Sequence, residues 1–251
     1  MTTTAASAHR TSTLPAASYA FSPRARLPMR SFEIAALRRD GSIYIGQQKA
    51  PAIHLFESAF AAFARGTPIA TPCGAVSIED LQPGDTILTS DGSLARLMWI
   101  GSSSFVPADA GRRIPLIRIT PDSFGHDRPD SFLTFGPAAR LLHTPHDLRS
   151  ANGEHRMLTP LRNFLDGVNV IEVAPPTPVR LFHLCLDRHA AISAGGIEVE
   201  SFHPGTATMQ RVSSSLRQRF LALFPHVTEA KDFGPQAFPR APDMAEPSEM
   251  V

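Results

Sequence analysis

Hydrophobic and polar residues alternate with a period of two over many short stretches of this chain, and turn-forming residues separate one stretch from the next. In segment 31–46 the alternation continues on both sides of Arg39-Asp40-Gly41, which predicts a β-hairpin. Segment 63–101 repeats the pattern several times and predicts a meander of short strands joined by tight turns. The expected strands cover residues 67–71, 76–78, 86–89 and 94–100, with one helical turn at 79–81.

Beyond the meander, the same pattern predicts strands at residues 114–119, 131–135 and 179–189. A tight turn at Ala194-Gly195-Gly196 follows the last of them. Only residues 213–224 carry a clear helical period, with four apolar side chains on one face and serines that can cap the first turn. The chain is therefore predicted to be mainly β, with one C-terminal helix.

The amino-acid composition supports a mainly β fold and separates the expected domain from its two tails. With 43% hydrophobic and 19% charged residues the 251-residue chain can form a core, and 23 prolines and 16 glycines suit short strands. The length favours one β-rich domain over two small ones. Both ends have the composition of unstructured tails, being polar and rich in proline. We expect tails at 1–30 and 226–251, a hairpin and junction at 31–61, and the main domain at 62–225.

Charge and apolar runs limit the partners. A formal net charge of +1 without a basic run argues against nucleic acid, and no apolar run approaches the roughly 20 residues of a membrane helix. The arginines of 1–30 also suit a targeting presequence, but the continuous apolar stretch of a secretory signal is missing, so a cytoplasmic location is expected. Cys73 and Cys185 lack metal-type spacing, and a turn cysteine plus a buried strand cysteine is favoured over a disulfide. No cofactor is expected, and an unidentified protein partner is compatible with the sequence.

Two parts of the chain resemble the Hint domain, the module shared by hedgehog autoprocessing domains and inteins, in its bacterial branch. Residues 62–67 are A-F-A-R-G-T where the family has C-F-x-x-G-T. Leu186-Asp187-Arg188-His189 and the segment 200–205, E-S-F-H-P-G, are close to the family's L-D-R-H and E-S-F-x-P-G. The resemblance spans residues 62–224 and implies a horseshoe-like fold of short strands and hairpins.

The resemblance also implies where the family's chemistry would lie. There the first cysteine attacks the preceding carbonyl in an N–S acyl shift, which leads to self-cleavage or protein splicing, but Ala62 stands at this position and its methyl group cannot attack. Segment 136–142, G-P-A-A-R-L-L, aligns with S-P-x-H-R-h-L, so Ala139 replaces the histidine that protonates the scissile amide. Gly195 stands where inteins keep an asparagine that cyclises.

A second alignment places the histidine motif at His143-Thr144-Pro145-His146-Asp147 instead. The first is favoured because Arg140 and the leucines match and the apolar strand 157–160 follows at the expected distance. In that alignment His143, His146 and His155 lie in or near a surface loop. These histidines, with His183, His189 and His203 downstream, have ligand chemistry, but they lack the spacing of a closed zinc site, and no metal is expected.

Three family residues remain as weak candidates for chemistry. Asp187 and His189 are either the remnant of a proton-transfer pair or residues that satisfy backbone groups at a strand corner. The structural interpretation is favoured because the nucleophile is missing. Thr67 is expected to cap a turn with its hydroxyl rather than to act as a nucleophile.

The sequence thus predicts a degenerate Hint module without autoprocessing activity, a binding or scaffold protein rather than an enzyme. The alternative from the enzyme class is an atypical self-cleaving Hint protein that uses Cys73 or Ser58 as a displaced nucleophile. A third possibility is a folding appendage with no biochemical role of its own.

Overall fold

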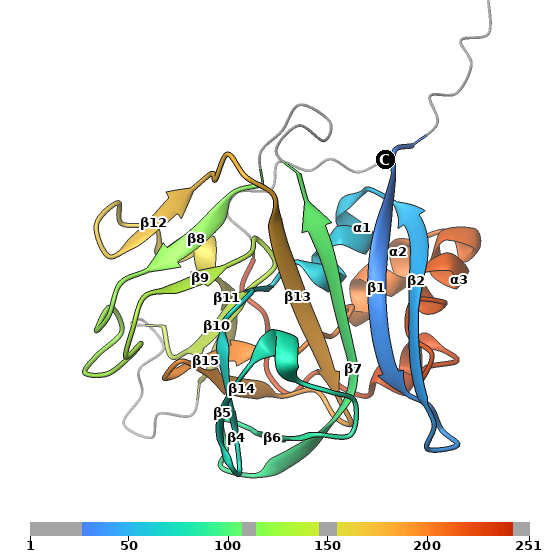
Figure 1. The fold of residues 1–251 in the computed structure, drawn as a ribbon, viewed down its shortest axis with the longest axis horizontal. Helices are drawn as coiled ribbons and strands as arrows, with labels where there is room; N and C mark the ends of the chain where they lie inside the picture. The colour runs from blue at the N-terminus through green and yellow to red at the C-terminus, as the bar shows by residue number, and fades with distance from the viewer. Residues whose placement is uncertain (1–26, 107–113, 146–154, 243–251) are drawn as a thin grey trace, which may run out of the picture.

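The structure of the chain is a computed structural model that describes residues 27–106, 114–145 and 155–242 (Figure 1). Residues 1–26 and 243–251 of the two expected tails lie outside the described residues, and so do His146 and Asp147. The described part is mainly β-strand, arranged in two antiparallel sheets. The prediction of a mainly β fold is confirmed.

The larger sheet has nine strands in the order β12-β8-β9-β3-β13-β7-β1-β2, and β6 pairs with β7 beside this path. Its members are β1 (Met29–Leu37), β2 (Ile43–Pro51), β3 (Phe63–Ala64), β6 (Thr86–Leu88), β7 (Leu94–Phe105), β8 (Leu116–Ile119), β9 (Leu133–Phe135), β12 (Val170–Val173) and β13 (Val179–Leu186). The long strands β7 and β13 pair from Val179↔Phe105 to Leu186↔Leu97 through the middle of the molecule (Figure 1). The two ends of the resemblance therefore meet in one sheet.

The smaller sheet has six strands in the order β11-β10-β15-β14-β4-β5. Its members are β4 (Pro68–Thr71), β5 (Gly74–Ser77), β10 (Arg140–His143), β11 (Met157–Pro160), β14 (Ala191–Ala194) and β15 (Ile197–Glu200). The predicted hairpin turn joins β4 to β5 at Pro72 and Cys73. Cys73 is exposed, Cys185 is buried in β13, and both cysteines are free. A bridge between Thr89 and Ile192 connects the meander to this sheet.

The N-terminal hairpin forms as predicted but is part of the larger sheet. β1 pairs with β2 over nine positions and with β7 from Glu33↔Ser102 to Ala36↔Trp99. The inward face of β1 carries Phe32, which is fully buried. Apolar burial on this face explains why the hairpin adds two strands to the domain instead of preceding it.

Three helices lie together beside and behind the β1–β2 hairpin in Figure 1: α1 (His54–Glu57), α2 (Thr206–Arg211) and α3 (Ser214–Leu221). The predicted C-terminal helix is α3, and the Ser213 hydroxyl accepts a hydrogen bond from the backbone N–H of Leu216 as its cap. The sequence did not predict α1 and α2, which have only four and six residues. An aromatic cluster holds the helices on the sheet; it includes Phe32, Phe56, Phe60, Trp99, Phe202, Phe220, Phe224 and Phe233.

The expectation of a disordered tail from residue 226 is wrong for residues 226–242. Phe233 is 8% exposed within the aromatic cluster. The Leu158 N–H donates to Pro239 O at 2.9 Å, and the Ala241 N–H donates to Leu158 O at 2.9 Å. The C-terminal segment 227–242 therefore packs on the fold, and its residues 239–241 lie along β11. Composition alone missed it because its contacts depend on a few anchoring residues. No helix among the described residues is long and apolar enough to cross a membrane.

Candidate functional site

The peptide bond between Ala61 and Ala62, at the entry to β3, is the one at which the resemblance places the family's scissile bond. Both side chains are buried, with exposures of 1% and 0%. The Ala62 N–H donates to Phe182 O at 3.0 Å, and the Ala62 carbonyl accepts from the Gly136 N–H at 2.8 Å. The Ala61 carbonyl accepts from the Ala138 N–H at 3.0 Å. Backbone groups therefore fix this bond from two sides.

Segment 136–139 forms a tight loop against that bond. A β-carbon on Gly136 would lie 2.1 Å from the Ala61 carbonyl oxygen, so the approach requires glycine. The Ala139 N–H donates to Gly136 O at 3.2 Å, and the Ala139 carbonyl accepts from the Leu161 N–H at 3.0 Å. Ala139 itself is 1% exposed. The structure thus brings the loop of the first alignment to the bond that the first motif defines.

The second alignment begins at His143, which lies in β10 and not in a surface loop. Its Nε2 is 2.8 Å from the Thr159 hydroxyl, and its ring packs edge-on against Phe164. Thr159 is in β11, the strand paired with β10, so the half-buried histidine joins two strands. His155 is exposed at the start of the last described range, and His146 lies outside the described residues.

Gly195 lies in the turn between β14 and β15 with φ of +55°, and its N–H donates to Pro68 O at 3.0 Å. A β-carbon at this position would come within 2.8 Å of the Leu133 side chain. An asparagine here would therefore need both an uncommon backbone conformation and a shift of Leu133. Leu133 of β9 therefore occupies the space that a side chain at position 195 would need.

The Thr67 hydroxyl donates to Ala64 O at 2.7 Å and is 3% exposed as a residue. This contact closes the turn between β3 and β4, where the Thr67 N–H also donates to Ala64 O at 3.2 Å. The hydroxyl is therefore engaged by the backbone and buried.

Asp187 and His189 differ sharply in environment. The Asp187 carboxylate is 46% exposed and lies 3.7 Å from the Arg188 guanidinium. The His189 side chain is completely buried; its Nδ1 accepts from the Ala237 N–H at 2.9 Å, and its Nε2 is 2.9 Å from a Glu200 carboxylate oxygen. Because Nδ1 accepts a backbone hydrogen bond, the proton is on Nε2 and is donated to Glu200. These contacts link His189 to Glu200 and to the C-terminal segment.

Glu200 is the centre of a buried polar cluster that the sequence did not single out. Arg240 donates to the same carboxylate oxygen at 2.8 Å, and the His203 ring lies 5.1 Å from the His189 ring. Burial raises the pKa of Glu200, but the hydrogen bond from His189 and the charge of Arg240 outweigh it, so the pKa is lowered. The alternation in I-E-V-E-S-F places Glu200 on the face of Glu198, opposite Ile197 and Val199, so the sequence pattern carried no signal of its burial.

The other two buried histidines stay neutral. Burial lowers the pKa of His203 to about 4 and that of His183 to about 3. His203 Nδ1 accepts from the Gly205 N–H at 3.0 Å, and its Nε2 lies 3.0 Å from Gly234 O. These histidines are packed as uncharged polar groups inside the fold.

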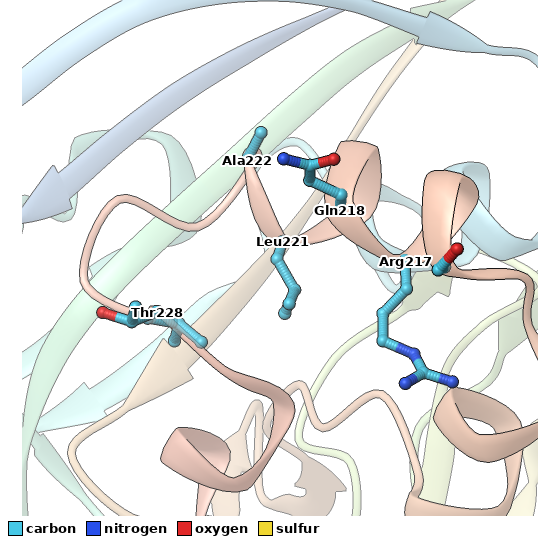
Figure 2. Close-up of a pocket in the computed structure, with 7 residues that line it drawn as sticks. Arg217, Gln218, Leu221, Ala222 and Thr228 are labelled. Carbon is cyan, nitrogen blue, oxygen red and sulfur yellow. The ribbon is translucent and has the colours of Figure 1, made fainter.

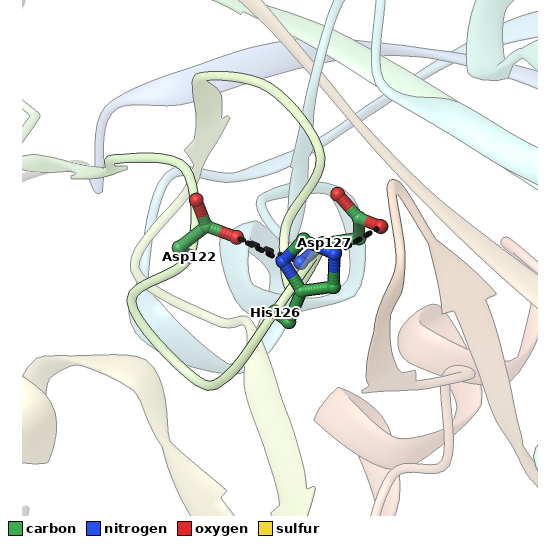
Figure 3. A group of neighbouring side chains, drawn as sticks. All are labelled: Asp122, His126 and Asp127. Carbon is green, nitrogen blue, oxygen red and sulfur yellow. Dashed lines mark hydrogen bonds and ion pairs between the residues drawn. The ribbon is translucent and has the colours of Figure 1, made fainter.

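A possible cation-binding group occurs elsewhere, in the loop after β8. Ligand atoms of Asp122, His126 and Asp127 lie within 4.8 Å of one another, and all three side chains are exposed (Figure 3). The imidazole forms ion-pair contacts of 3.9 Å to Asp122 and 3.3 Å to Asp127. Such an exposed group can hold a divalent cation only weakly, and it is separate from the histidines that the sequence offered as ligands.

The protein surface has two hollows. One of about 450 Å³ lies between α3 and the turn at Val227 and Thr228 (Figure 2). Arg217 lines it, donates to Val212 O at 3.1 Å and has a buried Nε without a hydrogen-bond partner among the described residues. The other, of about 600 Å³, crosses β8, β9, β3 and β13. Neither is lined by Ala62 or Ala139.

One family model and several solved structures are similar to this chain. The sequence model of a family described as Hint domain matches residues 61–206. The bacterial intein-like domain from Clostridium thermocellum is 12% identical, with a TM-score of 0.37, covering 57% of this chain and 99% of its own. The MchDnaB-1 intein is 17% identical, with a TM-score of 0.34, covering 56% of this chain and 100% of its own. The gp41-1 intein is 13% identical, with a TM-score of 0.34, covering 57% and 98%.

No curated protein matches the chain significantly. The family match begins at Ala61, includes the loop at 136–139, and ends after the E-S-F-H-P-G segment. It covers more than half of the 251 residues and contains every motif position discussed above. The chain therefore belongs to the Hint domain family.

Proposed function

We propose that this Hint domain does not cleave itself and serves as a binding or scaffold module for another protein. The observation that carries the proposal is the buried methyl group of Ala62, which stands directly after the carbonyl that the family's chemistry attacks. An acyl shift needs a lone pair on that side chain, and a methyl group has none.

The surroundings of the bond support the same conclusion. The Ala138 N–H still donates to the Ala61 carbonyl, a contact that can polarise the carbon toward attack. The alanine at 139 has no proton to give the amide nitrogen. A site that keeps its backbone contacts but has neither nucleophile nor acid is suited to structure and not to turnover.

The enzyme alternative requires a displaced nucleophile. The Ser58 hydroxyl donates to Leu55 O at 3.4 Å, within the helical turn that precedes the bond. Cys73 is exposed in the β4–β5 turn, whereas the Ala61 carbonyl is engaged inside the fold. Either residue would have to reach the carbonyl of Ala61, which is buried inside the fold, and this disfavours both.

Intact-mass spectrometry tests the proposal. The purified full chain is incubated with and without dithiothreitol, and the 27.2 kDa mass is expected to persist in both. A fragment ending at or near Ala61 would overturn the proposal. Should one appear, the variants Ser58→Ala and Cys73→Ser identify the nucleophile, because only loss of the true one abolishes cleavage.

A further inference from the structure

The hollow of about 600 Å³ is a groove on the larger sheet, lined by three arginines and by no carboxylate. Arg65 follows β3, Arg118 is in β8 and Arg180 is in β13, so three separate segments of the sheet each bring one arginine to the lining. We call this surface the arginine groove. Thr134, Val173 and Pro175 also line it.

Strand register explains how Arg118 reaches the groove. Side chains two residues apart share a face, so Arg118 lies on the same side of β8 as Leu116. Leu116 is 3% exposed and packs with Ala61 and Leu181. Arg118 is exposed and pairs directly with Thr134 of β9. The groove therefore has apolar lining, which includes the buried Leu116, beside the polar Arg118 and Thr134.

The three arginines differ in their partners. Arg65 forms an ion pair with Glu79 at 3.3 Å, and Arg180 forms one with Glu33. Neither carboxylate lines the groove. The Arg118 side chain forms no ion pair or hydrogen bond with any other described residue, so its charge is uncompensated within the described chain. Arg118 thus brings to the lining a positive charge that no carboxylate of the described chain pairs with.

We propose that the arginine groove binds a small organic anion that carries a phosphate or carboxylate group and an apolar chain. The guanidinium of Arg118 matches either head group in a two-pronged geometry, and the Thr134 hydroxyl adds a neutral donor beside it. The apolar chain covers Val173 and Pro175. The volume is in the range of about 300–1,000 Å³ that small-molecule sites occupy.

Binding of a small anion goes beyond the proposed function, which concerns a protein partner, and the two can fail separately. Ligand titration measures binding at the groove, whereas intact mass measures cleavage at Ala61. A protein that cleaves itself and binds the anion would refute only the proposed function. A protein that neither cleaves itself nor binds the anion would refute only the proposed anion site.

Isothermal titration of the full chain with hexyl phosphate, hexanoate and uncharged hexanol tests the proposal at low ionic strength. One or both anions are expected to bind saturably and hexanol is not, and the tighter anion identifies the head group. The absence of saturable binding by either anion below roughly 10 mM would overturn it. So would binding of an acidic peptide when neither small anion binds.

Variants locate the site. Arg118→Gln is expected to weaken anion binding about tenfold or more, since hydrogen bonds to charged groups are the strong ones. Arg96→Gln, at an exposed arginine of β7, is the matched control and should stay within about twofold. Ala174→Trp fills the groove and keeps every arginine, so it should also abolish binding. Equal affinity in Arg118→Gln and Arg96→Gln, or unchanged affinity in Ala174→Trp, refutes the proposed site.

Discussion

The carbonyl oxygen of Ala61 lies so close to Gly136 that a β-carbon on the glycine would fall 2.1 Å from it. Real β-carbons do not approach a backbone oxygen this closely, so one of the two segments must move to accept a side chain. The same segment supplies the N–H groups that hold the carbonyls of Ala61 and Ala62. Packing of the loop at 136–139 therefore determines the position of the peptide bond between Ala61 and Ala62.

Gly136→Ala should lower the free energy of unfolding by about 1–3 kcal/mol, the usual range for forcing an extra methyl into a packed interior. Gly46→Ala is the control, because the β-carbon there would meet the tip of the Tyr44 ring, which can rotate away. Urea denaturation followed by circular dichroism compares the two. Equal losses in both variants would show that the close approach to Ala61 is relieved without cost.

Ala62→Cys alone should restore little or no thiol-dependent cleavage, because the position of the acid is still occupied by Ala139. A positioned acid contributes about 10²–10⁴-fold, so Ala62→Cys with Ala139→His should cleave at least about 100-fold faster than the single variant. Intact-mass time courses with dithiothreitol measure both rates. Native circular dichroism spectra must first establish that both buried substitutions are tolerated. Efficient cleavage by the single variant would place the acid elsewhere than position 139.

Much of the fold followed from local pattern. The hairpin about Arg39-Asp40-Gly41, the β4–β5 turn and α3 each have a complete signal within a few residues, and each is present. β12 has only four residues and pairs with β8, about fifty positions earlier in the chain. Nothing local distinguishes such a strand from an apolar loop, because its partner defines it.

The candidate site was predictable only in part. Motif spacing predicted that Ala62 and segment 136–139 belong together, and the backbone hydrogen bonds join them. It did not predict that His189 contacts Glu200 and the segment bearing Arg240, because the 226–251 region has the composition of a tail. Phe233 and Arg240 hold the C-terminal segment 227–242 on the fold, although its sequence shows no helical or strand periodicity.

Stability should fall as the pH is lowered from 7 to 5. Burial lowers the pKa of His203 to about 4, from 6.5. On acidification the unfolded chain therefore takes up the proton first, and the free energy of unfolding decreases between pH 6.5 and about 4. Each such histidine contributes a slope of up to about 1.4 kcal/mol per pH unit in that window. Below 4.5 the loss should steepen, because the lowered pKa of Glu200 stabilises the fold only while its carboxylate is charged.

Urea midpoints at pH 7, 6 and 5 measure this slope. His203→Gln should be less stable at pH 7 but lose less stability on acidification, since glutamine does not titrate. His126→Gln is the control, because that side chain is 92% exposed, and it should keep the slope of the parent chain. A pH-independent midpoint in the parent chain would contradict the prediction.

Arg240→Met should destabilise the protein by about 3–5 kcal/mol, because it leaves the carboxylate of Glu200, which is 4% exposed, without its closest cation. Lys231→Met removes an exposed cation of the same C-terminal segment and should leave the urea midpoint almost unchanged. Without Arg240, the neighbouring arginine of Glu200 is Arg140, at 3.7 Å. Adding Glu200→Gln removes this weakly compensated charge, so the double variant should lose less than the sum of the singles, with a coupling of about 1–3 kcal/mol. Urea denaturation of the parent chain, of Arg240→Met, of Glu200→Gln and of the double variant completes this cycle, and Lys231→Met is measured beside them as the control. Strict additivity would mean that Arg240 stabilises the segment through packing and its bond to His203 O, and not through the charge of Glu200.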